Sequence, residues 1–247
     1  MLDVRPLSPS IGAEVRGIDL SVPPDDSTRA ELDKAFIDHK VLFFRDQPIT
    51  TEQHVEFCRG FGELEIHPFV PCKPGYPEVM AITHDENRKG HENSWHSDVT
   101  WRQEPSLGSM LRAVEVPDVG GDTLFADMEA AFDGLGPAMQ EMCSSLTAVH
   151  DFTKVFGRYT TPEQMAEAKE KFPPAEHPVI RTHPVTGRRS IYVNVAFTSH
   201  IVGLRPDESA QLLAHLYRQA AIPEYQCRFR WEPDSLEIGR ASCRERV

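Results

Sequence analysis

The stretch Asn93-Ser94-Trp95-His96-Ser97-Asp98-Val99-Thr100-Trp101 carries a histidine and a carboxylate two residues apart. In an extended strand, residues i and i+2 project from the same face, so we expect His96 and Asp98 to bind one ion together. One imidazole and one carboxylate are two of the three ligands of the facial triad that holds non-haem iron(II). The H-x-D pattern alone occurs by chance in many chains, so its interpretation depends on the rest of the sequence.

Other stretches accompany this pattern in a fixed order. They are VLFFRDQ (41–47), FGEL (61–64), IHP (66–68), GGDTLF (120–125), HDF (150–152), HPVIRTHP (177–184) and YVNVAFT (192–198). Together with residues 93–101, they resemble the taurine dioxygenase family of the TauD/TfdA type over nearly the whole chain to Ser235. The resemblance implies an enzyme, an iron(II)- and 2-oxoglutarate-dependent dioxygenase, with Fe(II) as its metal and 2-oxoglutarate and O₂ as cosubstrates.

The resemblance also assigns roles to individual residues. His96 and Asp98 match the first two iron ligands, and Thr123 matches the position whose hydroxyl binds the distal carboxylate of 2-oxoglutarate. Five residues match positions that line the family's substrate pocket, namely His67, Val99, Trp101, Phe156 and Phe197. Taken without the resemblance, Thr123 is an ordinary strand threonine, the aromatic residues belong to a core, and His67 caps a turn.

One part of the family pattern is missing. The family requires a third ligand, a histidine in a stretch resembling W-D-N-R-x-x-x-H, and an arginine beyond it that pairs with 2-oxoglutarate. Residues 231–235 (WEPDS) lead up to that region, but residues 237–247 (EIGRASCRERV) resemble a translated sequencing-library adapter. None of the five later histidines, His150, His177, His183, His200 and His215, is a convincing substitute.

We therefore expect residues 1–236 to form a dioxygenase domain that lacks its C-terminal end, and residues 237–247 to be a non-native tail. A divergent natural terminus is the alternative. With two ligands and no cosubstrate arginine, the 247-residue chain is expected to bind iron weakly and to be inactive.

The expected reaction is hydroxylation of a small anionic substrate, coupled to decarboxylation of 2-oxoglutarate to succinate and CO₂. The first choice of substrate is taurine or another alkylsulfonate, whose hydroxylated product breaks down to an aldehyde and sulfite. His67, Phe156 and Phe197 favour a sulfonate, whereas Glu92 stands where taurine-specific relatives carry an amide. Alkyl sulfate esters and aryloxyalkanoates are the alternatives.

Two other classes of protein remain as hypotheses. A non-catalytic jelly-roll binding domain would not be expected to keep His96, Asp98 and Thr123 together. A zinc hydrolase is disfavoured because the sequence has no H-E-x-x-H motif beside its H-x-D pattern. Metal analysis, iron against zinc, separates these classes.

Many short strands interrupted by a few helices indicate a mainly β fold. We expect a strand within 11–20, a helix ending near His39 and capped by Ser27 or Thr28, a buried strand at 41–44, and a helix capped by Thr50 or Thr51. Later strands are expected at 78–83, 106–116, 122–125, 146–150, 179–183, 190–194 and 227–231, with a hairpin turn at 184–187 and helices at 161–171 and 207–219. With the resemblance, this order predicts a double-stranded β-helix (jelly roll, clavaminate synthase-like) with helices outside one sheet.

Composition limits the partners. The 247 residues carry a net charge of -12, which argues against a nucleic-acid or anionic-membrane surface. No stretch is long and apolar enough for a membrane span, and residues 1–17 lack the features of a signal peptide. The five scattered cysteines indicate a reduced, cytoplasmic protein. A homo-oligomer contact through residues 207–219 and 222–225 is a hypothesis.

Overall fold

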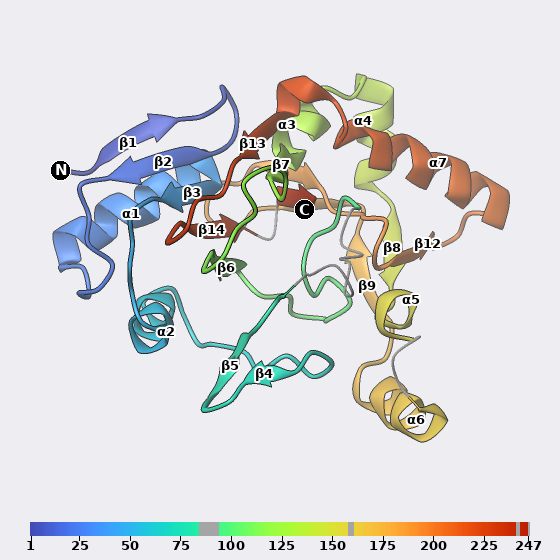
Figure 1. Cartoon of the computed structure of the whole chain (residues 1–247). Helices are drawn as coiled ribbons and strands as arrows, with labels where there is room; N and C mark the ends of the chain where they lie inside the picture. Colours follow the sequence, from blue (N-terminus) through green and yellow to red (C-terminus); the bar gives the residue numbers. More distant parts are fainter. Residues whose placement is uncertain (84–93, 158–160, 241–242, 247) are drawn as a thin grey trace.

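The computed structural model describes residues 1–83, 94–157, 161–240 and 243–246 (Figure 1). Its largest sheet has five strands in the order β1-β2-β3-β14-β6. Their bounds are β1 (Asp3–Pro6), β2 (Ala13–Arg16), β3 (Val41–Phe44), β14 (Leu236–Arg240) and β6 (Gly108–Arg112). β14 pairs antiparallel with both β3 and β6, so a strand from late in the sequence lies between two much earlier ones.

A second sheet has the order β13-β7-β15 and packs against the first. Its strands are β13 (Gln226–Phe229), β7 (Thr123–Asp127) and β15 (Cys243–Arg246). The contact between the sheets is aromatic: the Phe43 ring lies 5.4 Å from that of Phe125 and is stacked at 4.0 Å on that of Phe229. All three side chains are buried, so this cluster joins the two layers of the barrel.

The remaining strands form three smaller sheets. They are β12 (Thr198–Ile201), β8 (Thr147–His150) and β9 (Ala175–Pro178), the hairpin of β10 (Ile180–Thr182) and β11 (Arg189–Ile191), and the hairpin of β4 (Cys72–Lys73) and β5 (Tyr76–Met80). The predicted turn at 184–187 does connect β10 and β11, and Gly187 takes a φ of 69° there, which glycine adopts without strain.

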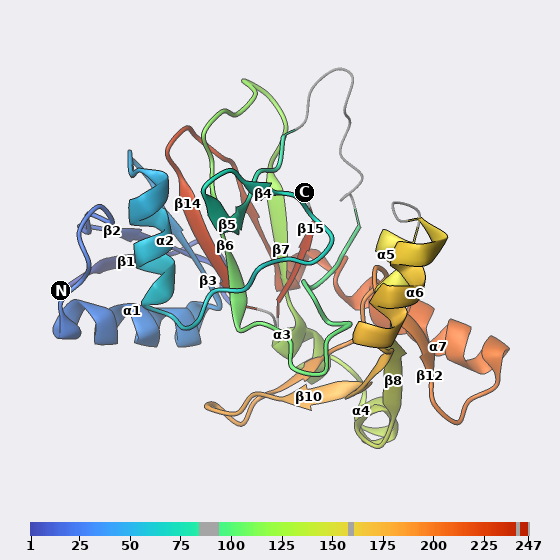
Figure 2. The same cartoon turned by 90° about the horizontal axis from the view of Figure 1, so that it is seen from below.

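Helices cover the sheets at both ends of the molecule. They are α1 (Asp26–His39), α2 (Thr51–Arg59), α3 (Met128–Asp133), α4 (Pro137–Ser144), α5 (Thr153–Phe156), α6 (Pro162–Lys171) and α7 (Pro206–Gln219), with a 3₁₀ turn, η1 (Pro223–Tyr225). Both views place α1 and α2 beside β1–β3, whereas α5, α6 and α7 lie at the opposite end (Figures 1 and 2).

Side-chain caps explain where the first two helices begin. Thr50 caps α2 as predicted, in a capping box with Gln53. The cap predicted for α1 is wrong: Asp25, rather than Ser27 or Thr28, accepts a hydrogen bond from the Thr28 backbone N–H. A carboxylate in this position also interacts favourably with the positive end of the helix dipole, an advantage that serine and threonine lack.

The predicted strands and helices are present, and most of them are shorter than predicted. The predicted strand within 11–20 covers only 13–16, and the one within 106–116 covers only 108–112. The sequence patterns missed β1, β4, β9, β12, β14 and β15, as well as the short helices α3, α4 and α5. β1 and β9 end in proline and lie at sheet edges, where a residue without a backbone N–H is tolerated.

A buried cluster of charged side chains connects α1 to α3. Lys40, at the C-terminal cap of α1, has a φ of 68°, and its side chain is 3% exposed. Its ammonium group lies 3.0 Å from Asp127 and 3.6 Å from Glu129, and it donates a hydrogen bond to the Ser10 carbonyl oxygen. Asp127 in turn caps α3, so this cluster fixes the end of β7.

The first residues of the predicted tail lie inside the main sheet. Leu236 and Ile238 pack in the apolar cluster between the sheet and α1, as ordinary strand residues do. Glu237, opposite Phe43 and Leu111, is completely buried. Charged residues rarely occupy such positions, so Glu237 is an unusual residue for the interior of this sheet.

Two further observations concern the described residues alone. None of the helices in this part of the chain is long and apolar enough to cross a membrane. Cys58, Cys72, Cys143 and Cys227 are free thiols.

Candidate active site

His96 and Asp98 face each other in the segment that leads into a tight turn. The His96 Nε2 atom lies 3.6 Å from Asp98 Oδ1. The other ring nitrogen, Nδ1, is 2.9 Å from the Ser94 carbonyl oxygen, to which it donates a hydrogen bond. This bond fixes the tautomer in which Nε2 carries the lone pair, as is typical of histidines that ligate metals. The two side chains therefore fit a shared divalent cation.

The backbone that brings them together differs from the prediction. His96 forms only an isolated bridge, and residues 98–100 form a turn, so the two side chains do not project from one regular strand. Val99 has a φ of 45°, in the left-handed region that β-branched residues avoid. The expected pair is thus present, but a strained turn rather than strand alternation creates it.

Within the described residues, no group of three His, Cys, Asp or Glu side chains is placed to hold a metal ion. His150 and His177 are buried and hydrogen-bonded to Thr100 and to the Arg102 carbonyl oxygen, and His200 is exposed. The residues that the structure describes therefore fit two ligands of a facial triad and supply no third.

The five predicted substrate residues all belong to one aromatic cluster. Val99, Trp101 and Phe197 are buried in it and Phe156 packs against them, while the His67 ring lies 5.4 Å from Phe156. Phe69, Phe152 and Phe172 belong to the same cluster: the Phe69 ring is stacked on those of Phe152 and Phe156, and Phe172 meets Phe69 and Trp101 edge-on. Since Val99 directly follows Asp98, the cluster adjoins the candidate metal ligands.

His67 is held as a neutral hydrogen-bond donor. Its Nδ1 accepts hydrogen bonds from the backbone N–H groups of Phe69 and Val70, which leaves the proton on Nε2. Burial, with a smaller contribution from the Arg102 cation, lowers the pKa of His67 to about 4. Trp101 is 2% exposed, and its indole N–H has no hydrogen-bond partner among the described residues. Two neutral N–H donors therefore lie within an otherwise apolar cluster.

Two buried histidines make the fold sensitive to acid. Burial is also the main cause that lowers the pKa of His54 to about 4. Between pH 6.5, the ordinary histidine pKa, and about pH 4, these histidines bind protons in the unfolded chain but stay neutral in the folded chain. The free energy of unfolding therefore falls as the pH decreases through this range. We expect His54→Gln to flatten this dependence in urea unfolding measured at several pH values. The exposed His200→Gln should leave the slope unchanged, and an equal slope in both variants would contradict the assignment.

Thr123 lies on a different wall of the barrel. It is the first residue of β7 and is 3% exposed, and it projects from the same face of the strand as Phe125, toward the main sheet. Its hydroxyl oxygen accepts a hydrogen bond of 2.9 Å from the Trp231 indole N–H. The described contacts of Thr123 therefore involve β7 and the segment after β13, and none of them joins it to the aromatic cluster.

The sequence analysis assigned no role to four polar residues beneath the turn. Thr100, His150, Asn194 and Thr198 are at most 1% exposed and bond to one another. All four lie in stretches that carry the resemblance, 93–101, 150–152 and 192–198, but the sequence gives no indication that their side chains bond to one another.

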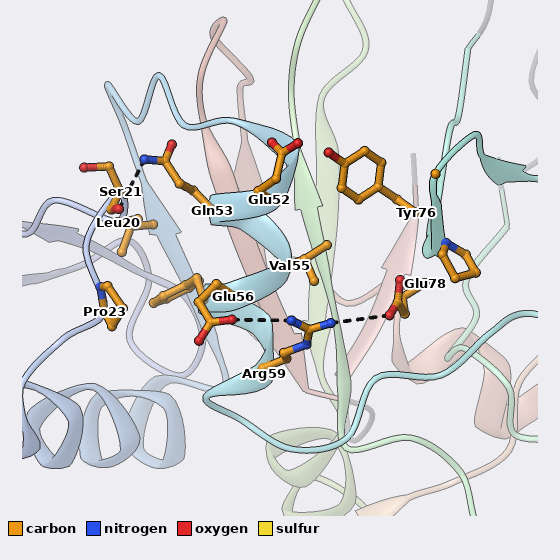
Figure 3. A pocket seen from close by; sticks show the side chains of 13 residues that line it. Leu20, Ser21, Pro23, Glu52, Gln53, Val55, Glu56, Arg59, Tyr76 and Glu78 are labelled. Carbon is orange, nitrogen blue, oxygen red and sulfur yellow. Dashed lines mark hydrogen bonds and ion pairs between the residues drawn. The ribbon is translucent and has the colours of Figure 1, made fainter.

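A separate groove of about 460 Å³ lies between α2 and β5 (Figure 3). Arg59 crosses it, with its guanidinium nitrogens 3.4 Å from Glu56 and 3.6 Å from Glu78. None of the predicted site residues lines this groove. It therefore adds nothing to the assignment of the active site.

Comparison with known proteins defines the class of this protein. The similar proteins include several α-ketoglutarate-dependent dioxygenases, and α-ketoglutarate is another name for 2-oxoglutarate. The chain belongs to the family described as taurine catabolism dioxygenase TauD, TfdA family, which matches residues 3–238. It is 34% identical to an alkylsulfatase of Acinetobacter baylyi, over 96% of this chain and 76% of that protein. It is 33% identical to an α-ketoglutarate-dependent sulfate ester dioxygenase of Pseudomonas putida, over 96% of this chain and 80% of that protein.

A solved structure, that of a taurine dioxygenase from Burkholderia xenovorans, superimposes with a TM-score of 0.85. It is 35% identical in sequence, and the match covers 99% of this chain and 82% of that one. The jelly-roll fold predicted from the sequence is therefore confirmed, as is membership of the dioxygenase family.

Proposed function

We propose that this dioxygenase domain hydroxylates an alkylsulfonate at the carbon that bears the sulfonate, with release of an aldehyde and sulfite. The observation that carries the proposal is the pair of neutral N–H donors, His67 Nε2 and Trp101 Nε1, within the aromatic cluster beside Asp98. Sulfonate oxygens are hydrogen-bond acceptors, and a short alkyl chain matches the surrounding rings. The Trp101 N–H is buried and has no acceptor among the described residues, which is costly, so a ligand that supplies an acceptor is favoured there.

In this proposal, His96 and Asp98 hold iron(II). The bound metal supplies the oxidation chemistry that couples conversion of 2-oxoglutarate to succinate and CO₂ with substrate hydroxylation. The chain's own residues orient the substrate and exclude water: the two N–H groups bind the sulfonate, and the rings of Phe156 and Phe197 cover the alkyl chain.

The cluster favours an apolar alkylsulfonate over taurine, because burial of the ammonium group of taurine among the rings of Trp101, Phe156 and Phe197 costs desolvation free energy. Glu92, the residue that bears on this choice in the sequence analysis, lies outside the described residues.

A ligand panel tests the substrate assignment. We expect butanesulfonate to shift the indole N–H resonance of Trp101 in NMR spectra more than taurine does at equal concentration. Hexyl sulfate and an aryloxyacetate are the competing ligands. A larger or tighter response to the aryloxyacetate would contradict the proposal, and binding without turnover in a chain that holds its metal would favour the non-catalytic binding domain.

We further propose that residues 237–247 are not native to the domain and that the third iron ligand is encoded beyond Ser235 in the natural gene. The lack of a third ligand among the described residues supports this reading. The decisive observation is the nucleotide sequence across codons 235 to 247, where adapter bases are expected. Without that ligand, the 247-residue chain should not give a stoichiometric absorption band when it is titrated with Fe(II) and 2-oxoglutarate.

Thr123 provides a test of cosubstrate binding. Its hydroxyl is expected to donate a hydrogen bond to the distal carboxylate of 2-oxoglutarate while it accepts the bond from Trp231. A hydrogen bond to a charged group contributes about 1.5–3 kcal/mol, so Thr123→Val should weaken 2-oxoglutarate binding by about 10- to 100-fold in calorimetric titration. Thr123→Ser keeps the hydroxyl and should bind nearly as the unsubstituted protein does. Equal affinities for the valine and serine variants would remove Thr123 from the site.

A further inference from the structure

The turn that carries Asp98 is strained at Val99. Of the four described residues other than glycine with positive φ, Val99 alone is β-branched, and its side chain is buried in the aromatic cluster. A left-handed conformation costs free energy for any L-residue with a Cβ atom, and most for a branched one. Such a conformation persists only where the surrounding structure enforces it.

A closed ring of buried hydrogen bonds surrounds the next residue, Thr100. The Asn194 side-chain amide donates to the Thr100 hydroxyl oxygen at 3.0 Å, and His150 Nδ1 lies 3.0 Å from the same oxygen. Thr198 completes the ring: its hydroxyl oxygen lies 3.4 Å from His150 Nε2 and accepts the backbone N–H of Asn194 at 2.9 Å.

The donors and acceptors of this ring are mutually consistent. The Asn194 carbonyl oxygen accepts the Phe197 backbone N–H at 2.9 Å, which orients the amide nitrogen toward Thr100. The Thr100 hydroxyl then donates to Nδ1 of a neutral His150, whose Nε2–H donates to Thr198. His150 and Thr198 are paired residues of neighbouring strands β8 and β12, so the ring rests on a sheet.

A second anchor holds the other end of the turn. The Arg102 backbone N–H donates to the Val99 carbonyl oxygen at 3.0 Å, and His177 Nε2 lies 2.8 Å from the Arg102 carbonyl oxygen. Residues 98–102 are thus attached to the β8–β9–β12 sheet at Thr100 and at Arg102, on either side of Trp101.

We propose that the ring of Thr100, His150, Thr198 and Asn194 is a positioning device that keeps Val99 in its left-handed conformation and so keeps the Asp98 carboxylate facing His96. Its effect on metal binding rests on the proposed function, because it assumes that His96 and Asp98 are ligands. Its effect on the backbone of Val99 does not depend on any metal.

The metal-binding experiment uses the full 247-residue chain and Mn(II), with free and bound ion distinguished by electron paramagnetic resonance. Thr100→Val removes the hydroxyl at nearly constant size and should weaken Mn(II) binding by about 10-fold or more, as loss of a residue that supports a ligand usually does. Thr100→Ser keeps the hydroxyl and should bind as the unsubstituted chain does. Adding Val99→Gly to Thr100→Val should restore most of the lost affinity, because glycine adopts the left-handed conformation without strain.

A second experiment needs no metal. Urea unfolding of the single variants Thr100→Val and Val99→Gly and of the double variant forms a double-mutant cycle. We expect Thr100→Val to destabilise the chain less when residue 99 is glycine. Asn194→Ala is a milder change, because it removes only one of the two hydrogen bonds to the Thr100 hydroxyl. It should also destabilise the chain less when residue 99 is glycine, and it replaces Thr100→Val in the cycle if that variant does not fold.

The outcomes separate the two proposals. No Mn(II) binding by the unsubstituted chain would show that His96 and Asp98 alone do not hold a metal, which overturns the effect of the ring on metal binding in this chain, while the unfolding cycle would still decide its effect on the backbone of Val99. Additive unfolding energies, or Mn(II) binding in Thr100→Val equal to that of the unsubstituted chain, would overturn the positioning role.

Discussion

Replacing residues 237–247 with the segment that follows the matched region in the Acinetobacter baylyi alkylsulfatase is expected to raise substrate-dependent succinate formation by about 100-fold or more. The family pattern places the third ligand and the cosubstrate arginine in this segment, where they would complete the proposed site of His96 and Asp98. Loss of a residue that merely supports a ligand already costs metal affinity about 10- to 100-fold, so gain of a ligand should have at least this effect. Succinate formation with butanesulfonate and 2-oxoglutarate, followed over time, measures it.

Two controls make this result specific. His96→Ala in the extended chain should return succinate formation to the background, because the site again has two ligands. His200→Ala, at an exposed histidine outside the site, should leave it unchanged. Equal activity of the extended chain and its His96→Ala variant would show that His96 is not a ligand.

Lys40→Met is expected to lower the free energy of unfolding by about 3–5 kcal/mol. The substitution leaves Asp127, which is 1% exposed, without its ammonium partner, whereas Glu129 keeps an ion pair with Arg188 at 3.1 Å. Removal of one partner from a buried ion pair has this magnitude because the remaining charge is uncompensated. Methionine tolerates the left-handed φ of 68° no worse than lysine does, so the effect arises from the charge. Urea unfolding at neutral pH measures it.

Lys34→Met is the matched control, on the same helix. Lys34 pairs with Asp38 on the surface, where their side chains are 77% and 48% exposed. Exposed pairs contribute little, so this change should stay within about 0.5 kcal/mol. Adding Asp127→Asn to Lys40→Met should recover part of the loss, since asparagine still caps α3. A loss of under about 1 kcal/mol for Lys40→Met would show that the cluster does not stabilise the fold.

Sequence patterns predicted the elements with strong local signals. The helical spacing of Leu32, Ala35 and Phe36 located α1, and the apolar run at 41–44 located β3. The missed elements have little local signal: β9 reads AEHP, and its place depends on pairing with β8. The position of β14 between β3 and β6 depends on tertiary contacts, which the periodicity of a single segment cannot reveal.

The site was predicted residue by residue only because several motifs occur in the order of the family. Local pattern placed His96 and Asp98 on a strand, whereas a turn with positive φ at Val99 orients them. The ring around Thr100 could not be predicted, because its members lie up to 98 residues apart in sequence and meet only in the folded protein. Hydrogen bonds between distant segments leave no periodicity to detect.

The central position of β14 has a consequence for how the protein is made. During translation, β3 and β6 leave the ribosome long before the strand that separates them, so the five-stranded sheet cannot close until residues 236–240 have emerged. Until then, the facing edges of β3 and β6 expose unpaired backbone groups and the apolar residues on either side of them. Nascent chains of this protein are therefore expected to depend on chaperones until residues 236–240 have emerged and paired with β3 and β6.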